Sequence, residues 1–510
     1  MAFLRHPQSI ALEFSNAECL RRNGLDPGLA KGFGGRLVCK GDTDYDKDRQ
    51  LSDPAFQKYP KLIAYCGTEV DVAWCLRLAN IGSLPFTCRS GGHSTAGYSV
   101  VDNGLVIDMS NFNFVFPQSS DTVIIGPGVR FGDLNRFLSL YDVHIPGGGC
   151  SDVRIGGYMQ GGGYGFTSRE FGMHCDNVAE LRVMLWDTNR KDGRTVVAGP
   201  NNEYSDLFWA VRGGTGNNFG VVTAVTYNLH KLKGIWGVWL QWPLDQGVDQ
   251  AAKALALLQN QYMLSGAPNT FGYMVLITAQ GPNNVPVMMV RAMFDGSRGD
   301  LDQLLQPLIN AGGVAPPGIQ SPQWGSYADM NEALMETPYG IPQLPSGQTW
   351  GEDKQSGYIA QTLQVSVWQR ILQYFLTSFT GSNPYGYVCP YTTVVLEPMG
   401  GAINSRPTSY NAFVHRTAAT DFFCDVFWQI PGNQEQPAKQ WLDRFMELMA
   451  PYFNGECYQN YPRAKLVGLP DYKRAYWASN YPALVRVKKK YDPANFFNFP
   501  QSIDPNDAVA

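Results

Sequence analysis

Short runs rich in strand-forming residues alternate with stretches of helical periodicity through roughly the first 230 residues. Between two of the apolar runs, Thr68 and Asp71 have the spacing of a capping box, and apolar residues continue at helical spacing as far as Gly82. This pattern predicts an α+β arrangement. The expected strands, each ended by glycine or a polar turn, lie at residues 61–66, 85–90, 105–110 and 122–129.

From about Ile235 onward the pattern changes to longer apolar runs with amphipathic helices between or after them. Long strands followed by helices are typical of an antiparallel sheet covered on one face. Residues 312–325 and 337–351 are rich in proline and glycine and are expected to be loops. The expected strands are 234–243, 270–279, 285–294 and 422–430, and the expected helices are 248–263 and 435–449.

Composition narrows the class of protein. The chain has 510 residues, more than the roughly 250–300 that one hydrophobic core usually serves, so at least two domains are expected. A net charge of -4 gives no basic footprint for nucleic acid. No apolar run reaches the ~18 residues of a membrane helix, so no membrane partner is expected.

The N-terminal segment lacks the features of a signal peptide, which favours a cytoplasmic protein and leaves a mature secreted form as the alternative. The ten cysteines form no C-x-x-C pair and the six histidines show no H-x-x-x-H spacing. A metal site is therefore not expected.

Glycine clusters in three segments of the first half, at residues 89–99, 145–172 and 208–223. The first contains His93 and the second contains Cys150. Glycine loops with free N–H groups form concave sites for a pyrophosphate, and small residues let a flat ligand approach the backbone. The alternative is that these segments are ordinary turns, in which the histidine is simply hydrogen-bonded and the cysteine is simply buried. This alternative does not explain why glycine is so frequent in all three segments.

Together with the C-terminal residues 476–503, these segments resemble the berberine-bridge-enzyme-like branch of the vanillyl-alcohol-oxidase type of FAD-linked oxidase. The resemblance extends from about Tyr59 to Ile503. It implies an α+β protein in which a PCMH-type FAD-binding domain (residues 1–234) precedes a substrate-binding domain with an antiparallel sheet covered by helices (235–462). A C-terminal segment (463–510) then returns to the FAD domain.

The resemblance also implies FAD held by two covalent bonds, from His93 to the 8α-methyl group and from Cys150 to C6. Thiolate and imidazole are suitable nucleophiles for such bonds. The further residues expected to contact the cofactor are Arg89, Ser90, Gly91, Gly92, Ser94, Gly149, Val153, Gly156, Gly157, Tyr158, Gly162, Gly163, Gly220, Val222 and Asn495.

A flavin oxidase also needs a base that removes a proton from the substrate. Tyr458, in a segment that resembles the family's Y-x-N-Y motif, is the first candidate, with Tyr461 holding the substrate or donating to Tyr458. A tyrosine pKa near 10 is about three units too high unless its surroundings lower it. Asp425 is the second candidate, expected on the same strand face as Phe423 and Phe427. Packing of the two tyrosines at a domain interface is the alternative. Glu397 is a third, less favoured candidate, for which a structural role is the alternative.

The expected function is oxidation of an alcohol or hemiacetal carbon, with hydride transfer to flavin N5 and O2 converted to H2O2. Val153 favours this, because in plant relatives a valine three residues after the linked cysteine admits oxygen. The substrate is a sugar or oligosaccharide, or a specialised metabolite. The alternatives are a tailoring dehydrogenase or cyclase that uses another acceptor, and a catalytically silent flavin-binding protein. The partners expected are the small-molecule substrate and O2, and the chain is expected to be a monomer or a small homo-oligomer.

Overall fold

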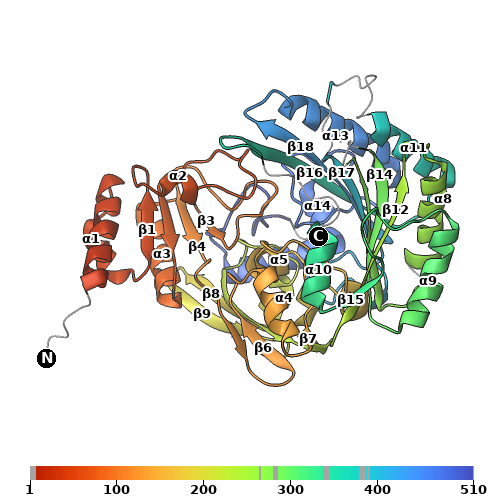
Figure 1. Ribbon diagram of the computed structural model, residues 1–510. Helices are drawn as coiled ribbons and strands as arrows, with labels where there is room; N and C mark the ends of the chain where they lie inside the picture. Colours follow the sequence, from red (N-terminus) through yellow and green to blue (C-terminus); the bar gives the residue numbers. More distant parts are fainter. Residues whose placement is uncertain are drawn as a thin grey trace.

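The computed structural model of the protein describes residues 7–263, 266–279, 285–336, 344–377, 386–387 and 391–508. Within them the strands form sheets of four, five and seven strands and one two-stranded ladder. The two smaller sheets lie to one side of the molecule and the seven-stranded sheet to the other (Figure 1). No helix of the described residues is long and apolar enough to cross a membrane.

The four-stranded sheet contains three of the strands expected from the sequence. Helix α3 (Glu69–Gly82) packs on it and begins at the capping box formed by Thr68 and Asp71, as predicted. Parallel pairing brings the ends of β2, β3 and β4 to one edge, where the first glycine-rich segment begins. The strand order is β1 (Arg36–Cys39), β2 (Leu62–Tyr65), β4 (Leu105–Asp108) and β3 (Phe86–Arg89).

The five-stranded sheet is antiparallel and supports the other two glycine-rich segments. Helices α4 (Phe131–Ser139) and α5 (Ile155–Gln160) share its hydrophobic core, which also contains Tyr458 and Trp477. Its order is β5 (Val115–Pro117), β6 (Thr122–Ile125), β10 (Val221–Asn228), β8 (Val178–Asp187) and β9 (Asp192–Ala198). The ladder pairs β7 (Val143–His144) with β11 (His230–Lys231).

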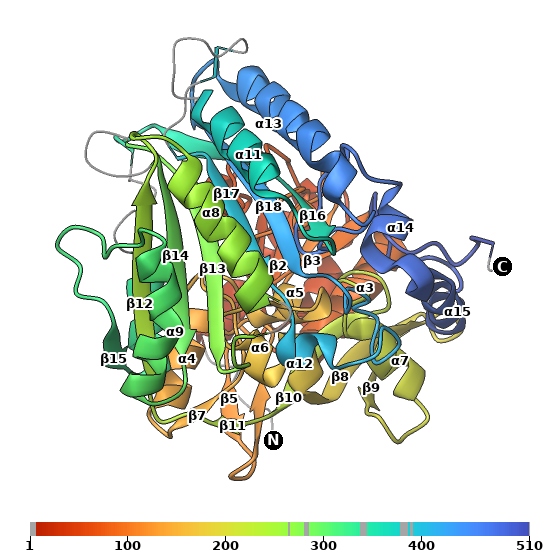
Figure 2. The same cartoon turned by 90° about the vertical axis from the view of Figure 1, so that its right-hand side faces the viewer.

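The seven-stranded sheet is antiparallel and is covered by helices on one face, as the sequence predicts. Figure 2 shows α8 (Asp249–Leu258), α9 (Arg298–Asn310), α11 (Val365–Thr377) and α13 (Glu435–Met449) in front of its strands. Its order is β15 (Gln323–Gly325), β12 (Ile235–Pro243), β14 (Val287–Phe294), β13 (Phe271–Thr278), β17 (Thr393–Pro398), β18 (Thr420–Ile430) and β16 (Thr349–Ile359).

Strand alternation gives the two faces of this sheet different surroundings. On β18, Cys424 and Val426 enter the apolar core beneath the helices. Phe423 and Asp425 point the other way, into a cavity, and Phe427 lines the cavity as well. The alternation predicted for this strand is therefore observed.

The last helices lie against the glycine-rich half of the molecule. Helices α14 (Tyr472–Trp477) and α15 (Tyr481–Tyr491) contribute to the core of the five-stranded sheet. Beyond them Phe497 enters the core around α3, with its ring 5.5 Å from that of Phe86. The short helices elsewhere are α2 (Tyr45–Asp48), α6 (Ser168–Phe171), α7 (Ser205–Val211), α10 (Tyr327–Glu336) and α12 (Gly401–Asn404).

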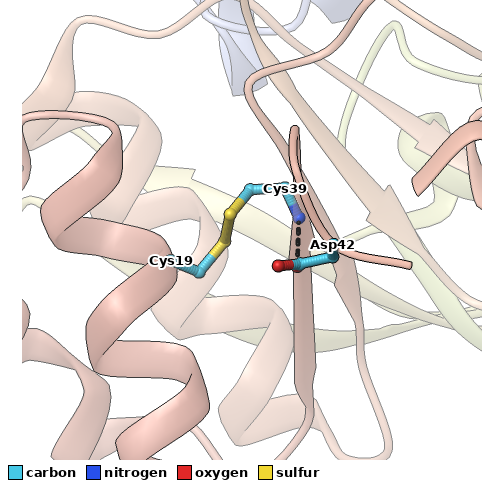
Figure 3. Close-up of side chains that lie close together, drawn as sticks. All are labelled: Cys19, Cys39 and Asp42. Atoms are coloured by element: carbon cyan, nitrogen blue, oxygen red, sulfur yellow. Dashed lines mark hydrogen bonds between the residues drawn. A yellow bond between two sulfur atoms is a disulfide. The ribbon is translucent and has the colours of Figure 1, made fainter. Parts of the chain in front are cut away.

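Three details differ from the expectations. The first proline-rich loop ends in strand β15, and the second runs into β16, with residues 337–343 outside those described. The helix expected at 248–263 is α-helical only to Leu258 and continues as a π-turn. A disulfide, Cys19–Cys39, ties helix α1 (Pro7–Arg22) to β1, and Asp42 accepts a hydrogen bond from the Cys39 N–H (Figure 3). Cysteine spacing alone gave no signal for this bond.

Candidate active site

A cavity of about 550 Å³ lies between the glycine-rich segments and the bare face of the seven-stranded sheet. Both His93 and Cys150 line it, although they are 57 residues apart in the chain. One wall of the cavity is thus glycine-rich loop and the other is strand. The loop wall also includes Ser90, Gly91, Gly92, Ser94, Gly149, Val153, Gly156, Gly157, Tyr158, Gly220 and Val222.

His93 is placed by the turn that follows strand β3. Gly92 has φ +79°, a backbone conformation that side chains disfavour, and its neighbour Gly91 packs against Arg154. Burial lowers the pKa of the His93 imidazole below its usual value, with the nearby Asp152 opposing that shift. The imidazole is therefore neutral at neutral pH, which is its nucleophilic form.

Cys150 lies in the loop between β7 and α5, and its thiol is free and exposed. Helix α10 holds this loop from the opposite side, because the Asn331 side-chain amide donates to the Gly149 carbonyl at 2.8 Å. A methyl group placed on Gly149 would lie 2.6 Å from the sulfur of Met335. Glycine at this position lets α10 approach the cysteine closely.

The loop wall fits a large flat cofactor. At Gly157, which lines the cavity, an added Cβ would meet no atom within 4 Å, so the open space begins directly at the backbone. At Gly156 an added Cβ would lie 2.4 Å from the Ser90 hydroxyl oxygen, so glycine is needed to pack the first two glycine-rich segments together. Asn217 from the third segment lines the cavity and accepts a hydrogen bond from the Cys88 N–H at 2.9 Å.

Comparison with known proteins identifies the cofactor of this fold. Residues 60–192 match the FAD binding domain family, and residues 457–504 match the family described as berberine and berberine like. Together the two matches support a berberine-bridge-enzyme-like FAD-linked oxidoreductase.

Individual relatives are similar over most of their length. An uncharacterized FAD-linked oxidoreductase of Bacillus subtilis, YgaK, is 28% identical over 475 residues, covering 92% of this chain and 97% of the relative. Berberine bridge enzyme-like 12 of Arabidopsis thaliana is 27% identical over 475 residues, covering 87% of this chain and 84% of the relative. The crystal structure of Physcomitrella patens BBE-like 1 shares the fold, with a TM-score of 0.79 at 24% identity over 96% of this chain and 100% of that one.

The candidate catalytic groups come from strand β18, which carries Asp425, and from the loop after α13, which carries Tyr458 and Tyr461. Tyr458 is fully buried, and its hydroxyl oxygen accepts hydrogen bonds from the Gly163 N–H at 2.8 Å and the Asn460 amide at 2.9 Å. Burial raises the Tyr458 pKa well above its usual value, and these two donors only partly oppose the shift. The ring of Tyr461 lies 4.9 Å from that of Tyr458, and burial raises its pKa as well.

Asp425 has a charged neighbour on the adjacent strand. Its Oδ1 lies 3.1 Å from the Lys354 ammonium, which is also 3.4 Å from a carboxylate oxygen of Glu352. Burial raises the pKa of Asp425 to about 7, while Lys354 lowers it. A carboxylate whose pKa lies near neutral pH is suited to accept a proton. The ammonium also lies 4.5 Å from the ring centre of Tyr461.

Glu397 and Asp421 form a second acidic pair deeper in the site. They face each other directly across β17 and β18, and both are fully buried. Glu397 lines the cavity, and its Oε2 has no hydrogen-bond partner. Burial and the neighbouring Asp421 raise the Glu397 pKa well above its usual range, which favours the protonated carboxyl.

Four residues expected to contact the cofactor lie outside the lining of the cavity, and their contact with FAD stays a prediction. Arg89 is turned away because its Nε donates to Asp108 at 2.7 Å. Gly162 and Gly163 lie behind Tyr458, and the Gly163 N–H donates a hydrogen bond to the Tyr458 hydroxyl oxygen. Asn495 belongs to a C-terminal turn closed by its N–H to the Asp492 carbonyl.

The sequence analysis missed several residues of the site. Lys354 and Glu352 lie on β16, inside a stretch whose first residues were expected to be loop. Strand β16 pairs with β18, which lies about 70 residues away in the chain, and this pairing places both side chains at the cavity. The available signal was a run of three charged residues, Glu352, Asp353 and Lys354, directly after the expected loop. Other unpredicted lining residues are Arg154, Gln160, Asn217, Met274 and Met335.

Proposed function

We propose that this FAD-linked oxidoreductase is an oxidase that converts an alcohol or hemiacetal to the carbonyl compound and reduces O2 to H2O2. The proposal rests on one observation: two nucleophiles, His93 and Cys150, share a cavity with a buried carboxylate of near-neutral pKa, Asp425. Bound FAD supplies the hydride acceptor and the reaction with O2. Residues of the chain itself attach the cofactor, position the substrate and accept its proton.

His93 and Cys150 are the residues that would hold FAD covalently. The neutral imidazole and the exposed thiol are both able to form such bonds, and they lie on the glycine-rich wall where the cofactor fits. Two attachment points keep the cofactor in a wide cavity. This matters here because the strand wall opposite must remain free for substrate.

Asp425 is the group that accepts the hydroxyl proton of the substrate. Oxidation of a CH–OH group removes a hydride from carbon and a proton from oxygen, so a base beside the hydroxyl lowers the barrier. Lys354 keeps part of the Asp425 population ionised in a buried site. Tyr458 is less suited to this role because burial raises its pKa, and its hydroxyl is already fixed by Gly163 and Asn460. It serves instead to position the substrate.

The substrate is a sugar or oligosaccharide, or a specialised metabolite. A dehydrogenase or cyclase using another electron acceptor is the second candidate, favoured only if the reduced protein does not react with air. The test has two stages. Anaerobic mixing with a panel of sugars, aromatic alcohols and amines should bleach the flavin absorbance with at least one alcohol. Admission of O2 should then restore the colour and yield one H2O2 per product. Absence of bleaching with every alcohol while an amine bleaches the flavin would overturn the proposal.

A further inference from the structure

Arg291, on strand β14, is a buried cation without a partner of opposite charge among the side chains that the structure describes. Its side chain is nearly inaccessible, with 2% exposure of the residue. Its Nη1 lies 3.5 Å from the Met335 carbonyl oxygen, and its Nε and Nη2 have no hydrogen-bond partner. Burial alone lowers its pKa, to about 10, so the guanidinium is charged at neutral pH and no described carboxylate offsets that charge. A buried ion without a partner is costly, so such a group calls for a ligand.

Three other buried arginines in the described part of the chain have hydrogen-bond acceptors for most of their guanidinium groups. Arg416 makes paired hydrogen bonds to Asp176, both at 2.7 Å. Arg89 pairs with Asp108. Arg169 has no carboxylate but donates to the carbonyl oxygens of Met263, Met399 and Ala267. Arg291 is the exception among these four.

Arg291 stands directly behind the wall of the active-site cavity. It pairs with Met274 on β13 in the antiparallel register, so the two side chains share the bare face of the sheet. Met274 and Met335 both line the cavity, and Met335 is the residue whose carbonyl approaches the guanidinium. Methionine side chains are unbranched and repack easily. Movement of one methionine side chain would therefore open Arg291 to the cavity.

The two free nitrogens specify the kind of ligand. Nε–H and one Nη2–H lie along the same edge of the planar guanidinium and point in parallel directions. A carboxylate matches this edge with two parallel hydrogen bonds, which is the strongest form of arginine recognition. We propose that Arg291 binds a carboxylate group of the substrate. This inference rests on the proposed function, because it assigns a further feature to the same substrate.

The placement also sets a minimum length for that substrate. The sheet order places β14 three strands from β18, with β13 and β17 between them. Strands in a sheet are about 4.8 Å apart, so Arg291 and Asp425 are separated by at least about 14 Å of sheet. The substrate is therefore an elongated hydroxy acid, with its oxidised hydroxyl at Asp425 and its carboxylate at the opposite end of the cavity.

The test compares two neutral-pH titrations of the holoenzyme, followed by the change in flavin absorbance. The probes are biphenyl-4-carboxylate and biphenyl-4-carboxamide, which have the same shape and differ in charge. The parent protein should bind the carboxylate at least tenfold more tightly than the amide. Arg291→Met should bind both equally, and Arg291→Lys should keep a reduced preference. Arg298→Met, at an exposed site on α9, is the matched control and should behave as the parent does.

Three results would overturn the inference: equal binding of the two probes by the parent, an unchanged preference in Arg291→Met, or binding of acetate as tight as that of biphenyl-4-carboxylate. The last would mean a site for small free anions. Thermal unfolding provides a check that does not depend on the flavin signal, because the carboxylate should raise the Tm of the parent and not that of Arg291→Met. Neither measurement requires turnover, so failure of the oxygen test and failure of this inference are distinguishable.

Discussion

The Lys354 ammonium lies 3.1 Å from Oδ1 of Asp425, and both side chains are buried on the face of the sheet that lines the cavity. The same ammonium contacts Glu352 and the ring of Tyr461. One cation thus faces two carboxylates and an aromatic ring at the wall of the cavity. Burial favours the neutral acid and Lys354 favours the carboxylate, and the balance leaves the Asp425 pKa near neutral pH.

Reduction of the flavin by substrate should depend on pH through Asp425. Only the ionised carboxylate accepts a proton, and its pKa is about 7. The rate of flavin reduction should therefore rise with pH up to about 7, by about tenfold per unit well below that value, and then level off. Anaerobic stopped-flow measurements between pH 5 and 9 would show this. The step should disappear in Asp425→Asn, and its persistence there would assign it to another group.

Replacement of the two base candidates should separate their roles. Asp425→Asn should slow flavin reduction by about 10²–10⁴-fold, the usual cost of losing a general base. Tyr458→Phe should keep the flavin and raise the substrate concentration needed for half-saturation more than it slows reduction. If Tyr458→Phe causes the larger loss in the reduction rate, the base is Tyr458 and Asp425 positions the substrate.

The denatured protein should stay yellow and should carry the added mass of one FAD. His93→Ala and Cys150→Ala should each leave one covalent bond, and the double variant should release all of its flavin. Cys88→Ala is the matched control, because this thiol lines the same cavity without an expected bond to the cofactor. Free flavin released by acid from the parent protein would contradict the proposed attachment.

Glu397 should affect stability in a pH-dependent way. Its folded-state pKa lies well above the unfolded value, so the folded state keeps a proton that the unfolded state loses. The stabilisation from this group is complete below about pH 4 and declines as the pH rises above it. Glu397→Gln mimics the protonated acid and should lack this decline. Urea unfolding at pH 5 and pH 8 should show a larger gain in the free energy of unfolding for the variant at pH 8. An equal effect at both values would mean that Glu397 is ionised in the folded protein.

The sequence predicted the elements of the fold well where periodicity was strong. The capping box at Thr68, four strands of the smaller sheets (β2, β3, β4 and β6) and the helix-covered antiparallel sheet were confirmed. Local signals such as these lie within a few residues of one another, so a single sequence contains them. The Cys19–Cys39 disulfide was missed because it joins residues whose proximity depends on how α1 packs against β1.

Prediction of the site likewise depended on whether a residue has a local signal in the sequence or matters only through contacts with distant segments. His93 and Cys150 were found because glycine surrounds each of them in the sequence. Lys354 and Arg291 were missed because their importance arises from pairing between distant strands, which determines which charges are paired and which are not. Burial without compensation, as at Arg291, has no signature in a sequence. Asn495 does not line the cavity, and membership of the C-terminal motif does not specify which of its residues reach it.

Val153 should control access of oxygen rather than access of substrate. It lines the cavity three residues after Cys150, and its carbonyl accepts a hydrogen bond from the Phe131 N–H at 3.0 Å, which fixes the backbone at this point. Val153→Leu adds one methylene and moves the branch point outward into the cavity. We expect slower reaction of the reduced protein with O2 and a nearly unchanged rate of reduction by substrate.

Stopped-flow measurement of each half-reaction would test this expectation, with Val153→Ala as the matched variant that widens the same path and should not slow the reaction with O2. Overpacking of a core by one methylene can cost ~1–3 kcal/mol, and such a defect would slow both half-reactions of Val153→Leu together. That outcome would contradict a specific role in oxygen access. If the reaction with O2 keeps the parent rate, oxygen reaches the flavin by a path that does not pass Val153. The selective slowing expected here requires that the added methylene lie between solvent and cofactor.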